Sequence, residues 1–142
     1  MEFSAEATAC YCATARKSAR ALTALYDAAL EPAGLRVTQY SLLKNVQRMG
    51  PVSLLRLGEA LRLDRTTLVR NLKLLEKNAM VRFEPDAASR ARLVSLTEKG
   101  EQSLTEATHL WLKAQTAVHE SFSGEERAIL RAFLRRLETV DF

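Results

Sequence analysis

The segment from Asp64 to about Asn78 has two chemically opposite faces, and this pattern limits the possible folds more than any other feature of the chain. At about 100° per residue, a helix over this segment places Leu68, Leu72 and Leu75 in one narrow stripe. The opposite face is polar and cationic and carries Thr66, Arg70, Lys73 and Lys77. Such a helix buries its leucines against neighbouring helices and turns its cations toward solvent. The segment is therefore expected to pack on an apolar lobe with its basic face exposed.

Apolar repeats and capping residues predict the other elements of the chain. Helices are expected over about residues 7–30, 38–48, 53–61 and 64–78, strands over 80–84 and 92–96, and helices over about 97–120 and 124–140. The expected N-cap residues are Thr38, Ser53, Asp64, Thr97 and Ser123. Two short helices joined by a tight turn and followed by a hairpin describe a winged helix-turn-helix. The expected fold is therefore mainly α with a small β-hairpin wing, in a single domain over residues 1–142.

Positive charge is concentrated in the middle of the chain, although the formal net charge of the 142 residues is only +4. Residues 36–96 carry twelve Lys and Arg against five Asp and Glu, a net charge of +7, whereas residues 1–35 and 97–142 are slightly acidic. Binding to phosphates needs clustered cations rather than a high average charge, so this distribution is typical of a nucleic-acid module between two scaffold segments. The alternative is an ordinary solvated basic surface.

The basic face of the predicted helix has side chains suited to reading double-stranded DNA. Arginine can pair with guanine O6 and N7, threonine methyls can contact thymine methyls, and lysines suit phosphates. At the tip of the predicted wing, Arg90 and Arg92 could lie along or inside the minor groove, with Asp86 pairing with Arg90 to hold it in position. Each cation could instead belong to a solvated face. The expected DNA-binding residues are Ser53, Arg65, Thr66, Thr67, Arg70, Asn71, Lys73, Lys77, Arg90 and Arg92.

The inventory of reactive side chains argues against an enzyme. His109 and His119 are the only histidines, and a helix separates them by about 15 Å, too far to share a metal ion. The sequence has no glycine-rich phosphate loop and no nucleophile motif, so no catalytic residue, metal or cofactor is expected. No run approaches about 18 apolar residues and the start lacks a secretion leader, which favours a cytoplasmic protein that does not enter membranes. The remaining alternative is a helical adaptor, which would show no salt-dependent binding to duplex DNA.

The residues from Leu57 to Gly100 resemble the MarR family of bacterial transcription regulators. Their most specific piece is Leu96-Thr97-Glu98-Lys99-Gly100, at the start of the helix predicted over residues 97–120. Pro32-Ala33-Gly34-Leu35 and the VTQYSLLKNV that follows are similar to the beginning of the family's second helix. The family wing often reads Asp-x-x-Asp-Arg, and in Asp86-Ala87-Ala88-Ser89-Arg90 a serine replaces the second acid. The resemblance covers nearly the whole chain.

The resemblance implies that residues 36–96 form the DNA-binding lobe and that residues 1–35 and 97–142 interlock two subunits. A two-fold dimer would place two recognition helices about one turn of DNA apart, roughly 34 Å, and would bind a pseudo-palindromic operator. The implied function is that of a homodimeric repressor, released from DNA by a small aromatic acid or phenol as family members commonly are.

An effector of this kind needs an anion partner beside apolar walls. Arg16 and Arg20 lie four residues apart on one face of the first predicted helix, and either could hold a carboxylate. The expected walls are Tyr40, Leu43 and Trp111. The alternative is that the arginines form surface or interface ion pairs and that the tryptophan belongs to the core.

Cys10 and Cys12 suggest a different trigger for the same regulator. Some MarR-like regulators sense oxidants through a cysteine near the start of the first helix, where peroxide converts a thiolate to sulfenic acid and then to a disulfide. Two such positions on a helix lie about 200° apart, so a bridge within one chain is not expected. The alternative is that both cysteines are inert packing residues.

Overall fold

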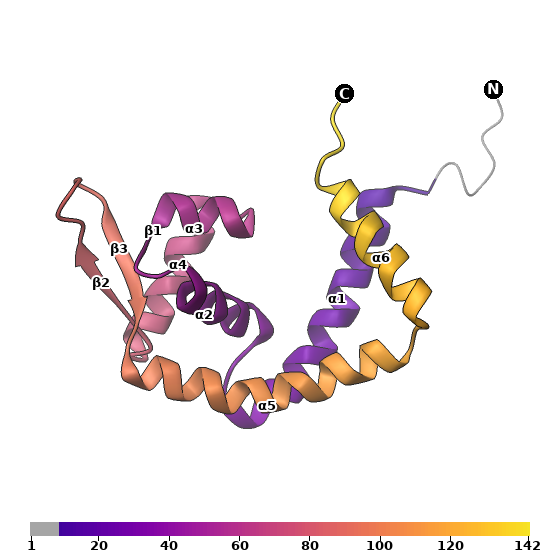
Figure 1. Ribbon diagram of the computed structural model, residues 1–142, viewed down its shortest axis with the longest axis horizontal. Coiled ribbons are helices and arrows are strands. Elements are labelled where there is room, and N and C mark those ends of the chain that lie inside the picture. The colour runs from indigo at the N-terminus through magenta and orange to yellow at the C-terminus, as the bar shows by residue number, and fades with distance from the viewer. Residues whose placement is uncertain (1–8) are drawn as a thin grey trace.

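The computed structural model describes residues 9–142 and shows a mainly helical chain with a small antiparallel sheet (Figure 1). The elements are α1 (Tyr11–Leu30), η1 (Glu31–Ala33), α2 (Val37–Met49), β1 (Val52–Ser53), α3 (Leu54–Leu61), α4 (Arg65–Lys77), β2 (Val81–Pro85), β3 (Arg92–Leu96), α5 (Glu98–Glu120) and α6 (Gly124–Leu137). The predicted fold class is confirmed. The predicted start of the first helix at residues 7 and 8 lies outside the described residues, and α6 ends three residues before its predicted end.

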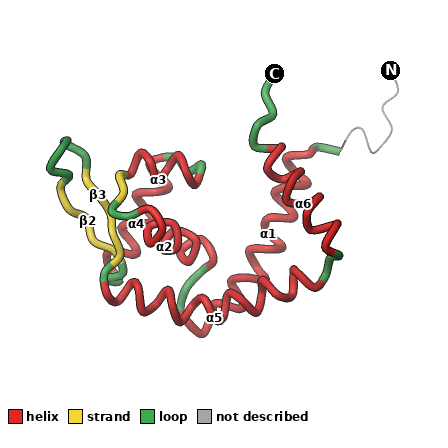
Figure 2. The backbone as a smooth tube through the Cα atoms, viewed as in Figure 1, coloured by secondary structure: helices red, strands yellow, loops and turns green. Residues whose placement is uncertain are grey.

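The elements form two arms joined by α5 (Figure 2). One arm is a lobe that contains α2, α3, α4 and the sheet, and the other arm contains α1 and α6. α5 runs from the wing to α6 and packs on both α1 and α2. Tyr26 of α1 donates its hydroxyl to Gln115 Oε1 of α5, and its ring centroid lies 6.4 Å from that of Trp111. These contacts fix α1 relative to the helix that continues from the lobe.

The wing belongs to a three-stranded sheet with the order β1-β3-β2. β2 and β3 pair antiparallel, from Val81 opposite Leu96 to Pro85 opposite Arg92, which confirms the predicted hairpin. The sequence does not predict β1, because two residues are too few to show a strand pattern. Val52 is a strand residue through its pairing with Val94 of β3. β1 therefore ties the start of α3 to the wing.

The core of the lobe contains the leucine face of α4. Leu68, Leu72 and Leu75 are completely buried, as predicted. Their partners in the same cluster come from α2, α3 and the sheet and include Leu42, Leu43, Val46, Leu57 and Val94. Because α4 is anchored in a core that α2 shares, the position of α4 depends on the position of α2.

Side-chain caps determine where four of the helices begin. α3, α4, α5 and α6 have their predicted N-caps, and each cap accepts a hydrogen bond from the backbone N–H three residues later. The N–H of Thr67 lowers the pKa of the Asp64 carboxyl, and the N–H of Ser123 lowers the pKa of the Glu126 carboxyl. A lowered pKa means that hydrogen bonding favours the charged form, so these caps hold their acids as carboxylates.

The predicted cap of α2 is wrong. α2 begins at Val37, directly after Arg36, and Thr38 lies inside its first turn. Gln39 Oε1 accepts a hydrogen bond from the Arg36 N–H at 2.9 Å, and Asp27 Oδ1 accepts one from the Val37 N–H at 2.7 Å. Asp27 belongs to α1, so a side chain from another helix takes the part that a local Ser, Thr, Asp or Asn usually plays.

Candidate nucleic-acid interface

α4 turns its basic face to solvent, as the sequence predicts. The exposed residues on this face are Arg65, Thr66, Arg70, Lys73 and Lys77. The first four of them, together with Val69, line a shallow open depression along the helix. The major groove of DNA admits an α-helix whose side chains can then reach the base edges. The exposed face of α4 therefore has the shape and the chemistry of a recognition helix.

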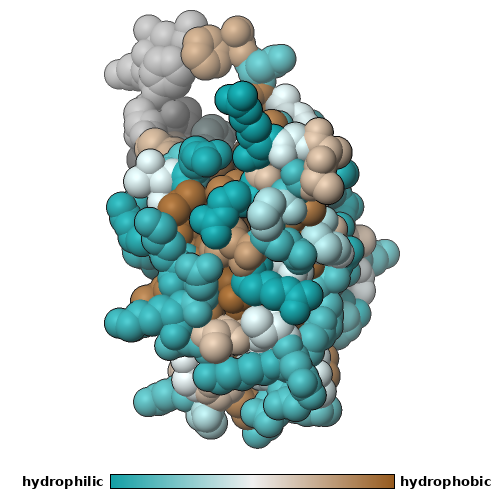
Figure 3. Space-filling view, turned by 90° about the vertical axis from the view of Figure 1, so that its left-hand side faces the viewer, coloured by the Kyte–Doolittle hydropathy of each residue, from teal (hydrophilic) through white to brown (hydrophobic). Residues whose placement is uncertain are grey.

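The cations of α4 are not neutralised by neighbouring acids. Within residues 9–142, the ion pairs are Arg36 with Asp27, Arg62 with Glu138, and Arg82 with Glu84, and none of them involves α4. The side of the molecule that carries the wing is covered largely by hydrophilic side chains (Figure 3). The charge on α4 is thus available to phosphates, which supply most of the affinity for DNA.

Three of the predicted DNA-binding residues are engaged within the lobe or half-buried. Thr67 donates its backbone N–H and its hydroxyl to the Asp64 carboxylate, at 2.8 and 2.9 Å. Ser53 Oγ accepts the N–H of Arg56 at 3.3 Å, and Asn71 is half-buried. Thr67 and Ser53 therefore shape the starts of α4 and α3, and contact of all three with DNA stays a prediction.

A groove beside α4 was not found from the sequence. Thr38 and Ser41 of α2 line it together with Thr67 and Asn71 of α4, above an apolar floor. The sequence does not predict this groove because Thr38 is expected to be a helix cap. In the structure Thr38 is instead exposed in the first turn of α2. The groove is a mainly apolar hollow between α4 and the start of α2, with four polar side chains in its lining.

The two wing arginines predicted to contact DNA, Arg90 and Arg92, are both exposed. The guanidinium carbon of Arg92 lies 4.7 Å from the ring centroid of Phe83, so a cation–π contact holds this side chain against β2. Arg90, near the tip, is exposed. Arg92 is thus preorganised on the strand, while Arg90 is positioned only by the turn that carries it.

Asp86 was predicted to pair with Arg90, but its partners in the structure are different. Its carboxylate accepts hydrogen bonds from the Ala88 N–H and the Ser89 hydroxyl, both at 3.0 Å, and in the part of the chain that the structure describes no ion pair joins it to Arg90. Ser89 stands where the family pattern has a second acid, and its hydroxyl donates a bond that a carboxylate could not. Such short-range bonds close a turn without a long side chain. Asp86 supports the wing tip by closing its turn.

The residues predicted for an effector pocket are only partly brought together. Tyr40 and Leu43 are buried in the core, and the Tyr40 ring stacks on Trp111 with centroids 5.6 Å apart. Arg16 and Arg20 are exposed on α1. Along the helix axis they lie about 15 and 9 Å from Tyr26, the α1 residue that reaches Trp111. Within the single chain, the aromatic stack and the arginines are separate.

Cys10 and Cys12 are both exposed thiols. Cys10 precedes α1 as its N-cap, with extended backbone, and its Sγ accepts the N–H of Ala13 at 3.5 Å. The predicted angle of about 200° between the two cysteines assumed that both are helical. Because Cys10 lies outside the helix, that angle does not separate the two thiols.

Two negative findings apply to residues 9–142. None of their helices combines the length and the apolar character needed to cross a bilayer. No group of three or more His, Cys, Asp or Glu side chains is arranged to hold a metal ion.

Comparison with known proteins agrees with this geometry. A family profile described as a winged helix DNA-binding domain matches residues 35–100. The transcriptional regulator MosR of M. tuberculosis, solved in complex with DNA, is 32% identical with a TM-score of 0.79, and the match covers 92% of this chain and 97% of MosR. The HTH-type transcriptional regulator YwoH of Bacillus subtilis is 28% identical over an alignment of 124 residues, and the match covers 84% of this chain and 90% of YwoH.

A mutant MarR of E. coli, solved with operator DNA, has the same fold, with a TM-score of 0.80 at 20% identity, over 87% of this chain and 90% of MarR. MosR and YwoH are both transcription regulators. The winged helix, the exposed basic face of α4 and the extent of these matches show that the chain belongs to the MarR family of DNA-binding transcription regulators.

Proposed function

We propose that this protein is a homodimeric repressor that binds a pseudo-palindromic operator and is released from it by a small aromatic acid or phenol. The dimer is supported by an apolar surface on the arm that contains α1 and α6. This α6 apolar face consists of Ile129, Leu130, Phe133, Leu134 and Leu137, all exposed. No residue of α6 is buried in the single chain.

A second copy of the chain is the partner that fits the α6 apolar face. Contiguous apolar patches of this kind are uncommon on monomers. Leu22 and Leu25 of α1 are exposed as well, and α1 lies in the same arm (Figure 1). A two-fold axis beside this arm would bury the same surface on each subunit and would leave both copies of α4 exposed. The two copies would then read two half-sites about 34 Å apart.

Phe133→Asp is expected to convert the dimer to a monomer, because it places a charge in the α6 apolar face. Operator affinity should fall by about 100-fold or more, since separate subunits lose the effective concentration that couples the two half-sites. Sedimentation velocity measures the mass, and fluorescence anisotropy measures binding to the DNA. Phe133→Leu, which keeps the face apolar, is the control. A Phe133→Asp protein that sediments as a dimer, or a monomeric wild type, would contradict this proposal.

Two kinds of group could bind an aromatic acid, cations and aromatic rings, and they lie at different places in one subunit. Arg16 and Arg20 are exposed on α1, whereas the stacked Tyr40 and Trp111 lie at the junction of α2 and α5. A carboxylate bound to an arginine of one subunit could place its ring beside the aromatic stack of the other subunit. An effector at such a site would change the angle between the arms, and thereby the separation of the two α4 helices.

Oxidation of a thiol is the alternative trigger, and the exposure of Cys10 at the N-terminus of α1 favours it. Peroxide oxidises a thiolate to sulfenic acid with release of hydroxide. A second thiol then attacks the sulfenic sulfur, forms a disulfide and releases water. Cys12 is the nearest second thiol in the sequence, and the corresponding cysteine of the partner is the other candidate.

One experiment separates the two triggers. Operator complexes are titrated with benzoate, hydroxybenzoates and phenol in one series and with hydrogen peroxide in the other, and anisotropy records release. An aromatic effector should release wild type and not the Arg16→Ala, Arg20→Ala double variant. Peroxide should release wild type and not Cys10→Ser, and mass spectrometry of the non-reduced protein then distinguishes a bridge within a chain from one between chains. Release in neither series would contradict both triggers.

A further inference from the structure

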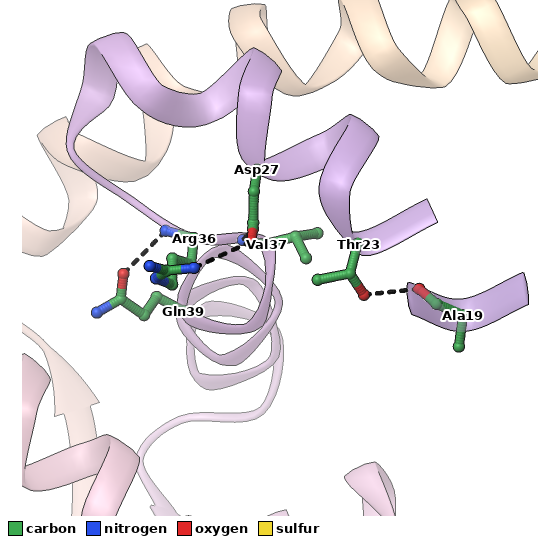
Figure 4. Close-up of polar contacts among 6 residues, drawn as sticks. All are labelled: Ala19, Thr23, Asp27, Arg36, Val37 and Gln39. Atoms are coloured by element: carbon green, nitrogen blue, oxygen red, sulfur yellow. Dashed lines mark hydrogen bonds and ion pairs between the residues drawn. The ribbon is translucent and has the colours of Figure 1, made fainter. Parts of the chain in front are cut away.

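A short reversal of the chain brings the start of α2 beside the end of α1. η1 follows α1 directly, and Gly34 then adopts the left-handed backbone, with φ of 68°. Residue 35 is the last before the N-cap of α2. Asp27, one helical turn before the end of α1, consequently points at the first residues of α2 (Figure 4).

Asp27 makes two contacts with the start of α2, and they differ in strength. Oδ1 accepts the backbone N–H of Val37 at 2.7 Å, and Oδ2 accepts Nη1 of Arg36 at 3.4 Å. The Asp27 side chain is 21% exposed, whereas that of Arg36 is 78% exposed. An ion pair to an exposed guanidinium contributes little, but a short bond from a backbone N–H to a sheltered carboxylate is charge-assisted. The bond to Val37 is therefore the main link.

This link supplies something that α2 cannot supply for itself. The first N–H groups of a helix have no partner within the helix, and Arg36 at the N-cap has no side-chain acceptor to offer them. A carboxylate at this end is also favoured by the helix dipole. α1 belongs to one arm and α2 to the lobe, so the bond from Asp27 to Val37 is a directional polar link between the two arms.

The orientation of α2 determines that of the recognition helix. Leu42 and Leu43 of α2 are buried in the same cluster as Leu68 and Leu72 of α4. A close-packed core transmits a shift of one helix to the next. If the start of α2 pivots on α1, α4 moves with it.

We infer that Asp27 is a positioning residue for DNA recognition, which fixes the lobe relative to α1 and so fixes the spacing of half-sites that the protein accepts. The inference rests on the homodimer proposed above. Each base pair added between two half-sites moves them apart by about 3.4 Å and rotates one relative to the other by about 35°. A rigid dimer rejects such a change. A dimer whose lobes pivot tolerates it.

The test uses one duplex and its spacing variants. The duplex that wild type binds most tightly is selected from a random pool, and one or two base pairs are then added or removed at its centre. Asp27→Ala removes the acceptor, and Asp27→Asn keeps one, because an amide oxygen can also accept the Val37 N–H.

A second pair of variants changes only the donor. Val37→Pro removes the N–H, and proline is tolerated at the first position of a helix. The preceding residue, Arg36, already has the extended backbone that proline requires, with φ of −94° and ψ of 157°. Val37→Ala shortens the side chain and keeps the N–H, so it is the matched control.

Wild type, Asp27→Asn and Val37→Ala are expected to prefer the selected spacing strongly. In Asp27→Ala and Val37→Pro this preference should shrink by about tenfold or more, the fold-change expected when a hydrogen bond to a charged group is lost. Anisotropy measures the affinities, and circular dichroism melting shows whether each variant is folded. If Asp27→Ala does not fold, the two Val37 variants decide.

Three results would overturn the inference, and they can be told apart. A dimeric wild type with a strong spacing preference that Asp27→Ala and Val37→Pro retain would remove the role of Asp27 alone. The same holds if these variants lose affinity equally at every spacing, because the bond would then only stabilise the fold. A wild type that sediments as a monomer and shows no spacing preference would remove the dimer, and this inference with it.

Discussion

Arg70→Ala is expected to lower operator affinity by about 5- to 150-fold and to relax the preference for one base pair, because a bidentate arginine–guanine contact discriminates by about 1–3 kcal/mol. Arg70 is exposed on the face of α4 opposite the buried leucines, where its guanidinium can reach a base edge. Fluorescence anisotropy with operator and scrambled duplexes measures both effects. The loss should be larger on operator than on scrambled DNA.

Lys73→Ala is the matched comparison for Arg70→Ala, since both residues are exposed cations on the same face of α4. A lysine bound to phosphate carries no sequence information, so both duplexes should be bound more weakly by similar factors. The slope of log affinity against log salt concentration should become shallower by about one. Equal binding of operator and scrambled DNA by wild type, with no dependence on salt, would contradict the assignment of α4 as the recognition helix.

Gly100→Ala is expected to unfold or severely destabilise the lobe. A Cβ atom at this position would lie 2.0 Å from the backbone oxygen of Met80 and 3.0 Å from its carbonyl carbon, and neither can move without displacing the start of β2. The Met80 oxygen also accepts the Thr97 N–H. Overpacking of a core costs about 1–3 kcal/mol and sometimes more, and a backbone clash belongs at the upper end. A fall in Tm of about 8 °C or more should result.

Gly124→Ala is the control for this substitution. Gly124 also lies in the first turn of a helix, as the first residue of α6 after the N-cap Ser123. The nearest atom to a Cβ at Gly124 would be a flexible arginine nitrogen, Arg127 Nη2, at 3.6 Å. Alanine is favoured over glycine in a helix, so the Tm should stay the same or rise slightly. Thermal unfolding of both variants at equal protein concentration measures the difference. Similar Tm values for both variants would show that the first turn of α5 does not need this close approach.

The clash at Gly100 explains the sequence piece that most resembles the family. Thr97 caps α5 by accepting the Gly100 N–H at 3.0 Å, and its own hydroxyl donates to the backbone oxygen of Ala79. Gly100 then lets the first turn of α5 lie against Met80. The Leu-Thr-x-x-Gly pattern therefore joins the wing to α5, because Thr97 caps the helix and Gly100 permits its close approach to Met80.

Much of the recognition helix could be predicted because its determinants are local. The cap at Asp64, the buried Leu68 and Leu72 and the exposed Arg70 all follow from the spacing of residues along one helix. The cluster of positive charge in residues 36–96 likewise needs no structure. Contacts with DNA at each side chain stay predictions, because they depend on a partner molecule.

The errors occurred where a competing partner decided the outcome. Thr38 is a reasonable cap by residue type, but Gln39 and Asp27 hold the N–H groups of residues 36 and 37 and α2 begins earlier. At the wing tip, Asp86 could have paired with an arginine, but it accepts the hydroxyl of Ser89 at 3.0 Å instead. In both places two residues of suitable type were available as hydrogen-bond partners, and the sequence alone does not show which one binds.

The helical order, the winged helix and the two faces of α4 follow from the sequence alone, since periodicity and caps act within a few residues along the chain. The strand β1 and the start of α2 do not, because β1 exists through the pairing of Val52 with Val94 and the start of α2 depends on Asp27. These features depend on groups that chain folding brings together from different elements. The recognition helix could therefore be identified from the sequence, whereas the hydrogen bond proposed to orient it, between Asp27 and Val37, was found only in the tertiary structure.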